Sequence, residues 1–244
     1  MDSTREHYDR HLGPVYSWMA GGRESAMTRG AEELDVLGIV VGDGAEAIDL
    51  GAGFGMHAIP LAQRGFDVLA IDSCAALLAE LRGQAGTLPI PVQTIHDDLR
   101  SFARHRPEKV DLVLCMGDTL THLPDEASIA ALVADLGRTI REGGRFVATL
   151  RDYSTALLDS QRFIPVRSDP ARILTCFLEY ADSHVTVHDI LHTWDGSAWS
   201  LRVSAYQKLR IDPDRLEALL RENGFVVERA TSPSGMLRFD ARRA

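Results

Sequence analysis

A glycine-rich turn between an apolar run and a predicted helix is the feature that most constrains the fold of this chain. The run at residues 47–50 leads into Gly51-Ala52-Gly53-Phe54-Gly55, and residues 56–63 have a composition typical of a helix. Glycines let such a turn tighten and let the backbone approach a ligand closely. Asp72 follows at the end of a second predicted strand. A strand, a glycine turn, a helix and a downstream acid together predict a ligand site at the carboxyl end of a parallel sheet.

Strands and helices alternate after this turn, which predicts parallel βαβ units and a doubly wound α/β sheet. Ile129, Leu132, Val133, Leu136 and Ile140 form the apolar stripe of a helix over residues 126–141, which we expect Gly143-Gly144 to end. The other strands of this part are expected at residues 66–71, 91–95, 110–116 and 146–150.

The apolar pattern changes to a period of about two after residue 151, which indicates antiparallel strands. The expected strands are 174–180, 184–192 and 199–210, and Asp195-Gly196 joins the last two as a turn. A helix opened by Asp212-Pro213 and strands at 225–230 and 236–243 then complete the chain. We therefore predict a Rossmann-like, seven-stranded doubly wound sheet with an inserted antiparallel meander.

The predicted organisation is one domain over residues 1–244. Residues 1–40 form N-terminal helices that act as a lid, with breaks near Gly13-Pro14 and Gly21-Gly22. Residues 41–151 form the cofactor-binding core, 152–211 the inserted strands on the substrate side, and 212–244 the last helix and two strands.

Composition excludes several classes of function. The 26 Lys and Arg residues against 35 Asp and Glu residues give a net charge of -9, which disfavours nucleic acid or an anionic membrane as a partner. Cys74, Cys115 and Cys176 are far apart, which favours reduced thiols in the cytoplasm over a zinc site. We see no signal peptide and no apolar run that would span a membrane.

Three histidines four residues apart, His184, His188 and His192, raise the question of a metal site. The β-branched residues between them favour a strand, in which residues four apart are about 13 Å from each other. We therefore expect no metal, although one of these histidines can reach the ligand pocket.

The segment Asp49-Leu50-Gly51-Ala52-Gly53-Phe54-Gly55 with Asp72 resembles motif I of the class I S-adenosylmethionine (SAM) methyltransferases. It departs from the G-x-G-x-x-G fingerprint of dinucleotide-binding proteins, because Met56 takes the place of the third glycine. The resemblance, best over residues 40–150, implies SAM as cofactor and S-adenosylhomocysteine as product. It implies that Asp49, Gly51, Gly53 and Gly55 shape the loop around the methionine part of SAM and that Asp72 binds the ribose, with Ser73 as a further cofactor contact.

Further cofactor contacts are implied by the same resemblance. Asp98 with Leu99 matches the segment that binds adenine, and Asp97 is the alternative to Asp98. Cys115 and Met116 end the fourth strand beside the cofactor, and Trp18 and Arg23 on the N-terminal helices contact SAM in a lid. For the last pair, packing of an amphipathic helix on the sheet is the alternative interpretation.

The loop from Cys115 to Asp125 resembles that of glycine N-methyltransferase and related small-molecule N-methyltransferases, including the pair His122-Leu123. Asp118 replaces an asparagine of that family and favours a cationic acceptor or a base. The resemblance implies that Arg151 binds a substrate carboxylate, unless it pairs with Asp118 or Asp152, and that Tyr153 orients the acceptor. His122 is the first candidate general base and Asp118 the second.

The resulting prediction is a SAM-dependent methyltransferase that methylates the nitrogen of a small amine or amino-acid-like acceptor by in-line transfer. O-methylation of a small hydroxylated metabolite is the alternative. A protein or RNA methyltransferase, an NAD(P)-dependent oxidoreductase and a SAM-binding protein without chemistry are the remaining alternatives. Whether the protein is a monomer or a homo-oligomer stays open.

Overall fold

Seven strands form one mixed sheet, in the order β10-β11-β5-β4-β1-β2-β3, and β11 runs antiparallel to both of its neighbours. The computed structural model describes residues 3–40, 44–86, 88, 91–106 and 109–244, so the predicted boundary between residues 40 and 41 adjoins residues outside the described ones. The strands are β1 (Glu46–Leu50), β2 (Asp67–Asp72), β3 (Gln93–His96), β4 (Val110–Cys115), β5 (Ile140–Leu150), β10 (Phe225–Thr231) and β11 (Leu237–Arg243).

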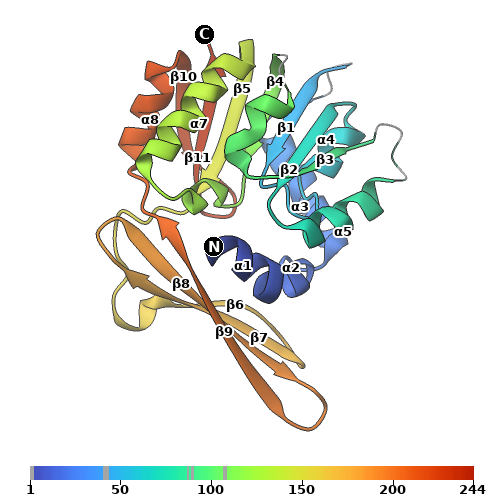
Figure 1. The fold of residues 1–244 in the computed structure, drawn as a ribbon, viewed down its shortest axis with the longest axis vertical. Coiled ribbons are helices and arrows are strands. Elements are labelled where there is room, and N and C mark those ends of the chain that lie inside the picture. The colour runs from blue at the N-terminus through green and yellow to red at the C-terminus, as the bar shows by residue number, and fades with distance from the viewer. Residues whose placement is uncertain (1–2, 41–43, 87, 89–90, 107–108) are drawn as a thin grey trace.

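Helices cover both faces of this sheet because its central strands are apolar on both sides (Figure 1). Ile48 and Leu50 of β1 pack in one core with α7 and α8, and Ala47 packs in the other core with α3, α4 and α5. The doubly wound fold predicted from the sequence is confirmed. These helices are α3 (Arg23–Val36), α4 (Ala58–Gln63), α5 (Ala75–Ala85), α6 (Phe102–His105), α7 (Glu126–Thr139) and α8 (Pro213–Glu222).

The predicted start of the fifth strand is wrong. Helix α7 ends at Thr139 and β5 begins at Ile140, so Gly143-Gly144 lies inside the strand and does not end the helix. Gly143 has a φ of 75°, and the register of β4 with β5 shifts beside it. The glycines therefore accommodate an irregularity at the start of a long strand.

The antiparallel sheet has four strands in sequence order, β6 (Phe163–Asp169), β7 (Arg172–Tyr180), β8 (His184–Trp194) and β9 (Trp199–Leu209). The meander and the turn at Asp195-Gly196 were predicted, and β6 was not. Pro165 and charged residues mask β6 in the sequence, and it is an edge strand with a register shift between Pro165 and Arg167. Proline is tolerated at a sheet edge because no partner needs its missing N–H.

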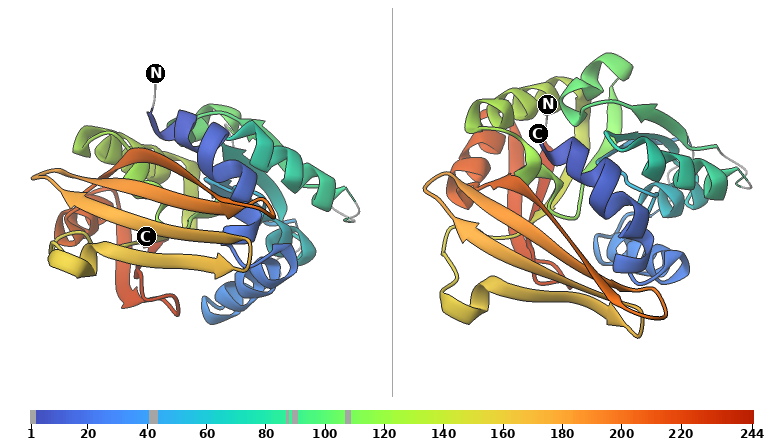
Figure 2. Two further views of the ribbon diagram at one scale, coloured as in Figure 1. Left: turned by 90° about the horizontal axis from the view of Figure 1, so that it is seen from below. Right: turned by 60° about the horizontal axis from the view of Figure 1, so that its bottom comes forward.

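The N-terminal helices lie between the two sheets, as Figures 1 and 2 show. The helix α1 (Ser3–His7) continues through a π-helical turn (Tyr8–Leu12) into α2 (Gly13–Met19). The break predicted at Gly13-Pro14 is therefore wrong, because the chain stays helical through both residues, and Pro14 stands in the first turn of α2, which follows directly on the π-helical turn. The break at Gly21-Gly22 is confirmed by φ values of 92° and 91°.

Within the described part of the chain, no helix combines the length and apolar character needed to cross a membrane. Short 3-10 turns at Leu99–Ser101, Thr119–His122 and Asp159–Arg162 complete the secondary structure, and the first two lie beside the site described next.

Candidate active site

A cavity of about 570 Å³ lies at the carboxyl ends of β1, β2 and β4, beneath the N-terminal helices. Eight of the residues predicted from the sequence to form the site line it. They are Gly51, Gly53, Asp72, Ser73, Asp98, Leu99, Met116 and His122. The cavity is also lined by Thr4, Tyr8, Tyr16, Phe54, Gly117, Thr119, Pro124, His184 and Gln207, among others.

The glycine loop leaves no room for side chains where it approaches the neighbouring loop. Gly51 has a φ of 72°, and a Cβ atom there would lie 2.7 Å from Oγ1 of Thr119 and closer still to Cγ2. Gly55 does not line the cavity, and a Cβ there would lie 2.9 Å from Leu81 and 3.1 Å from Ile59. Gly51 thus permits the close approach of the glycine loop to the loop that carries Thr119, and Gly55 permits the packing of α4 against α5.

Asp72 holds the glycine turn in place through hydrogen bonds to its carboxylate. Its carboxylate accepts the N–H of Gly53 at 2.7 Å on Oδ2 and the N–H of Cys74 at 2.7 Å on Oδ1. Burial raises the pKa of this carboxyl, whereas the two backbone N–H groups oppose that rise. Each oxygen keeps a lone pair with which to accept a ligand hydroxyl.

Asp97 and Asp98 follow β3, and only one of them lies at the cavity. Asp98 lines the cavity with Leu99, and Arg100 donates to both of its oxygens, which lowers the pKa of Asp98. Asp97 is bound by Arg104 and His105 at 2.7 Å each, and it is not among the residues that line the cavity. The geometry therefore favours Asp98 with Leu99 over the Asp97 alternative.

Asp49 lies beneath the loop and does not line the cavity. Its side chain is buried, and its Oδ2 has no hydrogen-bond partner among the described residues. Burial raises the pKa of Asp49 to about 6. The side chain of Asp49 therefore lies in the core and not at the cavity.

Asp49→Asn should stabilise the fold at neutral pH and leave it almost unchanged at pH 4. The folded-state pKa of about 6 lies above the ordinary value, so ionisation of Asp49 costs folding free energy as pH rises from about 4 to about 6. The expected gain at pH 7 is on the order of 2–3 kcal/mol. Urea unfolding of both proteins at pH 4 and pH 7 measures it, and an equal difference at both pH values would contradict the assignment.

Asp118 is not available to a substrate, contrary to the prediction. Its side chain is buried, and it accepts Nζ of Lys208, the hydroxyl of Tyr153 at 3.0 Å and the backbone N–H of Arg151 at 2.9 Å. Neither Asp118 nor Tyr153 lines the cavity. The reason is that β9 brings a cation, Lys208, to the end of β4, and the carboxylate pairs with it.

Arg151 is also displaced from its predicted role. Its side chain is exposed and does not line the cavity, and its backbone N–H rather than its guanidinium binds Asp118. Its guanidinium therefore lies outside the cavity in which the substrate carboxylate was expected, and it forms neither of the two alternative ion pairs, with Asp118 or with Asp152.

His122 does reach the cavity, in a cluster of rings. Its Nε2 lies 3.3 Å from the hydroxyl of Tyr8, and its ring stacks on that of Tyr206 with centroids 5.5 Å apart. Burial, followed by the charge of Lys208, lowers the pKa of His122 well below its ordinary value. The imidazole is therefore neutral at physiological pH, and protonation of it is disfavoured.

Trp18, Arg23 and Cys115, all predicted to contact the cofactor, do not line the cavity. The indole of Trp18 donates to Asp169 at 2.6 Å and packs under Arg172, and Arg23 binds Glu80 at 3.1 Å. Cys115 is buried in the core, whereas its neighbour Met116 does line the cavity. The indole was predicted to face the cofactor, but it contacts the antiparallel sheet.

Sequence reasoning missed Tyr8, Lys208 and Gln207. Tyr8 and Lys208 stand in segments without a motif, and only the packing of α1 and β9 against the core brings them to the site. Alternation along β9 offered a partial signal, because Tyr206 and Lys208 share one face of that strand and Gln207 faces the other way.

The three histidines of β8 do not gather around one point. His184 lines the cavity and its Nε2 lies 3.0 Å from the carbonyl of Pro124, whereas His188 pairs with Glu179. Among the residues that the structure describes, no group of three or more His, Cys, Asp or Glu side chains is placed to hold a metal ion.

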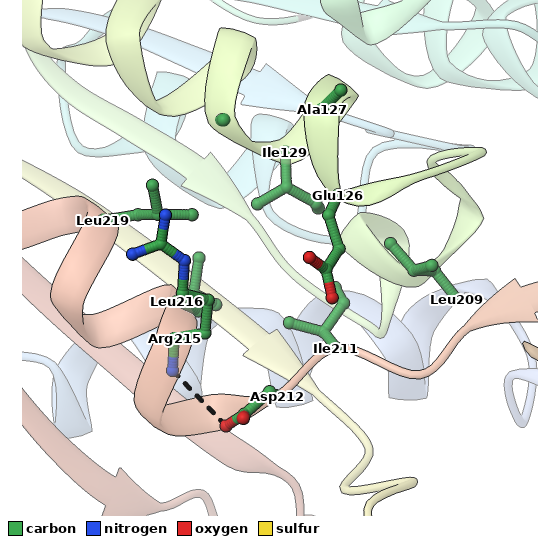
Figure 3. Close-up of a pocket in the computed structure, with 10 residues that line it drawn as sticks. Glu126, Ala127, Ile129, Leu209, Ile211, Asp212, Arg215, Leu216 and Leu219 are labelled. Carbon is green, nitrogen blue, oxygen red and sulfur yellow. Dashed lines mark hydrogen bonds between the residues drawn. The ribbon is translucent and has the colours of Figure 1, made fainter. Parts of the chain in front are cut away.

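A second, smaller cavity of about 180 Å³ lies between α7, the end of β9 and α8 (Figure 3). Ile129, Leu216 and Leu219 form part of its apolar lining, and Asp212 caps α8 by accepting the backbone N–H of Arg215. None of the predicted site residues lines this cavity, so the larger one is the candidate active site.

Comparison with known proteins shows which family the core of the chain is similar to. Residues 47–144 match the family model described as a methyltransferase domain. The resemblance noted from the glycine loop is thereby confirmed, and the matched segment runs from β1 into β5, past the whole floor of the cavity.

Relatives of this methyltransferase domain include N- and O-methylating enzymes. A glycine/sarcosine N-methyltransferase of Aphanothece halophytica is 30% identical over 110 residues, which are 45% of this chain and 42% of that protein. A ubiquinone biosynthesis O-methyltransferase of Photorhabdus laumondii is 31% identical over 116 residues, 47% of each chain. The chain thus spans less than half the length of these curated relatives.

Solved structures match the methyltransferase fold along almost the whole chain. An amino pentose methyltransferase of Micromonospora echinaspora, with SAM bound, has a TM-score of 0.76 at 19% identity and covers 94% of this chain and 95% of its own. A SAM-dependent methyltransferase of Clostridium acetobutylicum has a TM-score of 0.73 at 14% identity, with 99% and 98% covered. The fold, including the N-terminal helices and the antiparallel sheet, is that of the class I SAM methyltransferases.

Proposed function

We propose that the protein transfers a methyl group from SAM to the nitrogen of a small, uncharged amine. The observation that carries the proposal is the cavity itself. Its floor is the glycine loop held by Asp72, and its opposite wall consists of Tyr8, Tyr16 and the neutral ring of His122. When bound, SAM supplies a methyl group activated by the adjacent sulfonium.

The residues of the floor fit SAM part by part. Gly51 and Gly53 present backbone rather than side chains to the cavity, as the methionine part requires. Asp72 has lone pairs for the ribose hydroxyls. Asp98 and Leu99 line the same cavity, and we assign the adenine ring to this end of it. Positioning of the acceptor in line with the methyl group can lower the barrier by about 7–11 kcal/mol.

An amine suits this site better than a hydroxyl. A hydroxyl acceptor must lose its proton as it attacks, and the base that takes the proton becomes charged. His122 resists that charge, because its surroundings lower its pKa well below the ordinary range. A neutral amine attacks with its own lone pair as the sulfur–methyl bond breaks, and the ammonium that forms then gives its proton to water, so no protein base has to become charged during the transfer. We therefore assign His122 to the wall of the acceptor site and not to the role of general base.

The positions of the cations also argue against an acceptor that carries a carboxylate. Arg151, which would hold one in a glycine-like substrate, is exposed and outside the cavity, and Lys208 is paired with Asp118. Arg100 lines the cavity with its guanidinium on Asp98. This charge distribution favours an uncharged amine over an amino acid. The amino pentose methyltransferase has the same fold, and the glycine/sarcosine N-methyltransferase is a sequence relative.

Labelled methyl transfer tests the proposal. The protein is incubated with methyl-labelled SAM and with pairs of acceptors that differ only in an amine or a hydroxyl at one position. We expect label on the amines, and label in the low-mass fraction of a cell extract. Label confined to hydroxyl acceptors would establish the O-methyltransferase alternative, and label confined to macromolecules would refute a small-molecule acceptor.

His122→Phe should preserve most of the amine activity. Phe retains the ring that stacks on Tyr206 but cannot accept a proton, so we expect a loss of kcat below about tenfold, whereas loss of a general base would lower kcat by about 10²–10⁴. Steady-state kinetics with the best amine decides between these outcomes. Tyr206→Phe is the matched control, because it keeps the neighbouring ring of the same cluster.

We also propose that the chain acts as one domain in the cytoplasm. Its three cysteines are free thiols, and Cys74 and Cys115 are buried, which suits a reducing compartment. The acidic net charge of -9 supports a small-molecule acceptor over nucleic acid.

A further inference from the structure

A buried lysine joins the antiparallel sheet to the cofactor side of the molecule. Lys208 on β9 is 7% exposed, and its Nζ donates to Oδ2 of Asp118 at the end of β4. Lysine is rarely buried unless it is paired, so this contact accounts for its position. The pair connects residues 90 positions apart in the chain.

Asp118 is held at a strained point of the loop. Its φ of 73° lies in the left-handed region, and its N–H donates to the carbonyl of Thr149 at 2.9 Å. Arg151 and Tyr153 donate to the same carboxylate from the end of β5. The side chain of Asp118 therefore fixes a backbone conformation that few non-glycine residues adopt.

The residues on either side of Asp118 face the cofactor part of the cavity. Gly117 and Thr119 line it, and Thr119 packs so closely on Gly51 that no side chain would fit there. The hydroxyl of Thr119 donates to the carbonyl of Met116 at 2.7 Å. A shift of Asp118 therefore moves the surface on which the glycine loop rests.

Strand β9 also contacts the cavity. Gln207, the residue before Lys208, lines the cavity from the opposite face of the strand, and Tyr206 stacks on His122, which is part of the cavity wall. One strand thus carries a residue that lines the cavity, a ring that packs on its wall, and the cation that pairs with Asp118.

We propose that Lys208 is a positioning residue that couples the acceptor wall to the cofactor site through Asp118. It lines no part of the cavity itself. The ion pair of Lys208 with Asp118 keeps residues 117–119 in the conformation that supports Gly51. The same ion pair holds β9, and with it Gln207, at the cavity. The inference rests on the proposed function only in taking SAM as the ligand of this cavity.

A double-mutant cycle tests the coupling. Native protein, Lys208→Met, Asp118→Asn and the double variant are compared by calorimetric titration with SAM and by thermal unfolding. We expect Lys208→Met to weaken SAM binding at least about tenfold, because it leaves a carboxylate buried without its cation. The double variant should return to within about threefold of native affinity, since the asparagine Oδ1 can still accept the N–H of Arg151 and its Nδ2 can donate to the hydroxyl oxygen of Tyr153.

Two further variants separate positioning from loss of folding. Lys208→Arg keeps the charge and should retain more SAM affinity than Lys208→Met. Lys109→Met removes the other lysine of the chain, which is exposed, and should leave the affinity unchanged. Rescue of the affinity by a second substitution is an effect that a general loss of packing would not produce.

Three results would overturn the inference. The first is native SAM affinity in Lys208→Met. The second is a double variant as weak as the product of the two single effects, which would leave Lys208 a merely structural residue. The third is a native protein that binds no SAM, which would refute the proposed function as well and so differs from the first two.

Discussion

Asp72→Ala is expected to weaken SAM binding by at least about a hundredfold. The carboxylate is the group at the end of β2 that can accept two ribose hydroxyls, and hydrogen bonds to a charged group contribute about 1.5–3 kcal/mol each. Two such bonds amount to roughly 3–6 kcal/mol, or a factor of about a hundred or more. The substitution also frees the N–H of Gly53, which Asp72 now holds at 2.7 Å.

Calorimetric titration with SAM measures this loss, and Asp72→Asn is its matched control. Asparagine keeps one acceptor oxygen of similar geometry but loses the charge, so it should fall between native protein and the alanine variant. Thermal unfolding checks that the glycine loop is still folded. Native affinity in Asp72→Ala would refute the assignment of this edge of the cavity to the ribose.

Gly51→Ala is expected to abolish SAM binding and to destabilise the fold by about 2–4 kcal/mol. Part of that cost, about 1 kcal/mol, comes from the left-handed φ of 72°. The larger part comes from the new methyl group, which would lie 2.7 Å from Oγ1 of Thr119 and closer still to Cγ2. Both loops must then separate, and the floor of the cavity opens.

Gly143→Ala isolates the backbone contribution. Gly143 has a φ of 75°, and a Cβ atom there would meet nothing within 4 Å among the described residues. Its substitution should cost only about 1 kcal/mol in urea unfolding and leave SAM affinity intact. Equal destabilisation by Gly51→Ala and Gly143→Ala would show that the contact with Thr119 does not contribute to the loss of stability.

The carboxyl ends of the central strands were identifiable from the sequence because their signals are local. Glycines at 51, 53 and 55, an acid at 72 and the apolar stripe of α7 each report on a backbone conformation or on the face that a single element buries. The same holds for the hairpin at Asp195-Gly196. Signals of this kind located Gly51, Gly53 and Asp72 at the cavity, and the family resemblance added Ser73, Asp98, Leu99, Met116 and His122.

Partners across the molecule were decided by the tertiary structure. Asp118, Arg151 and Tyr153 were correctly expected to lie at the ends of β4 and β5, yet their roles depend on Lys208, which is distant in sequence and carries no motif. A buried carboxylate pairs with whichever cation packing brings to it, and β9 brings Lys208. The same packing of the antiparallel sheet turns Trp18 toward Asp169 and buries His122.

The sequence by itself therefore determined the fold and the cofactor edge, because periodicity and turn chemistry act over a few residues. The tertiary structure decided which polar groups face the acceptor and which neutralise each other. That choice depends on burial and on the docking of two sheets and the helices between them, and no single segment of the chain encodes it.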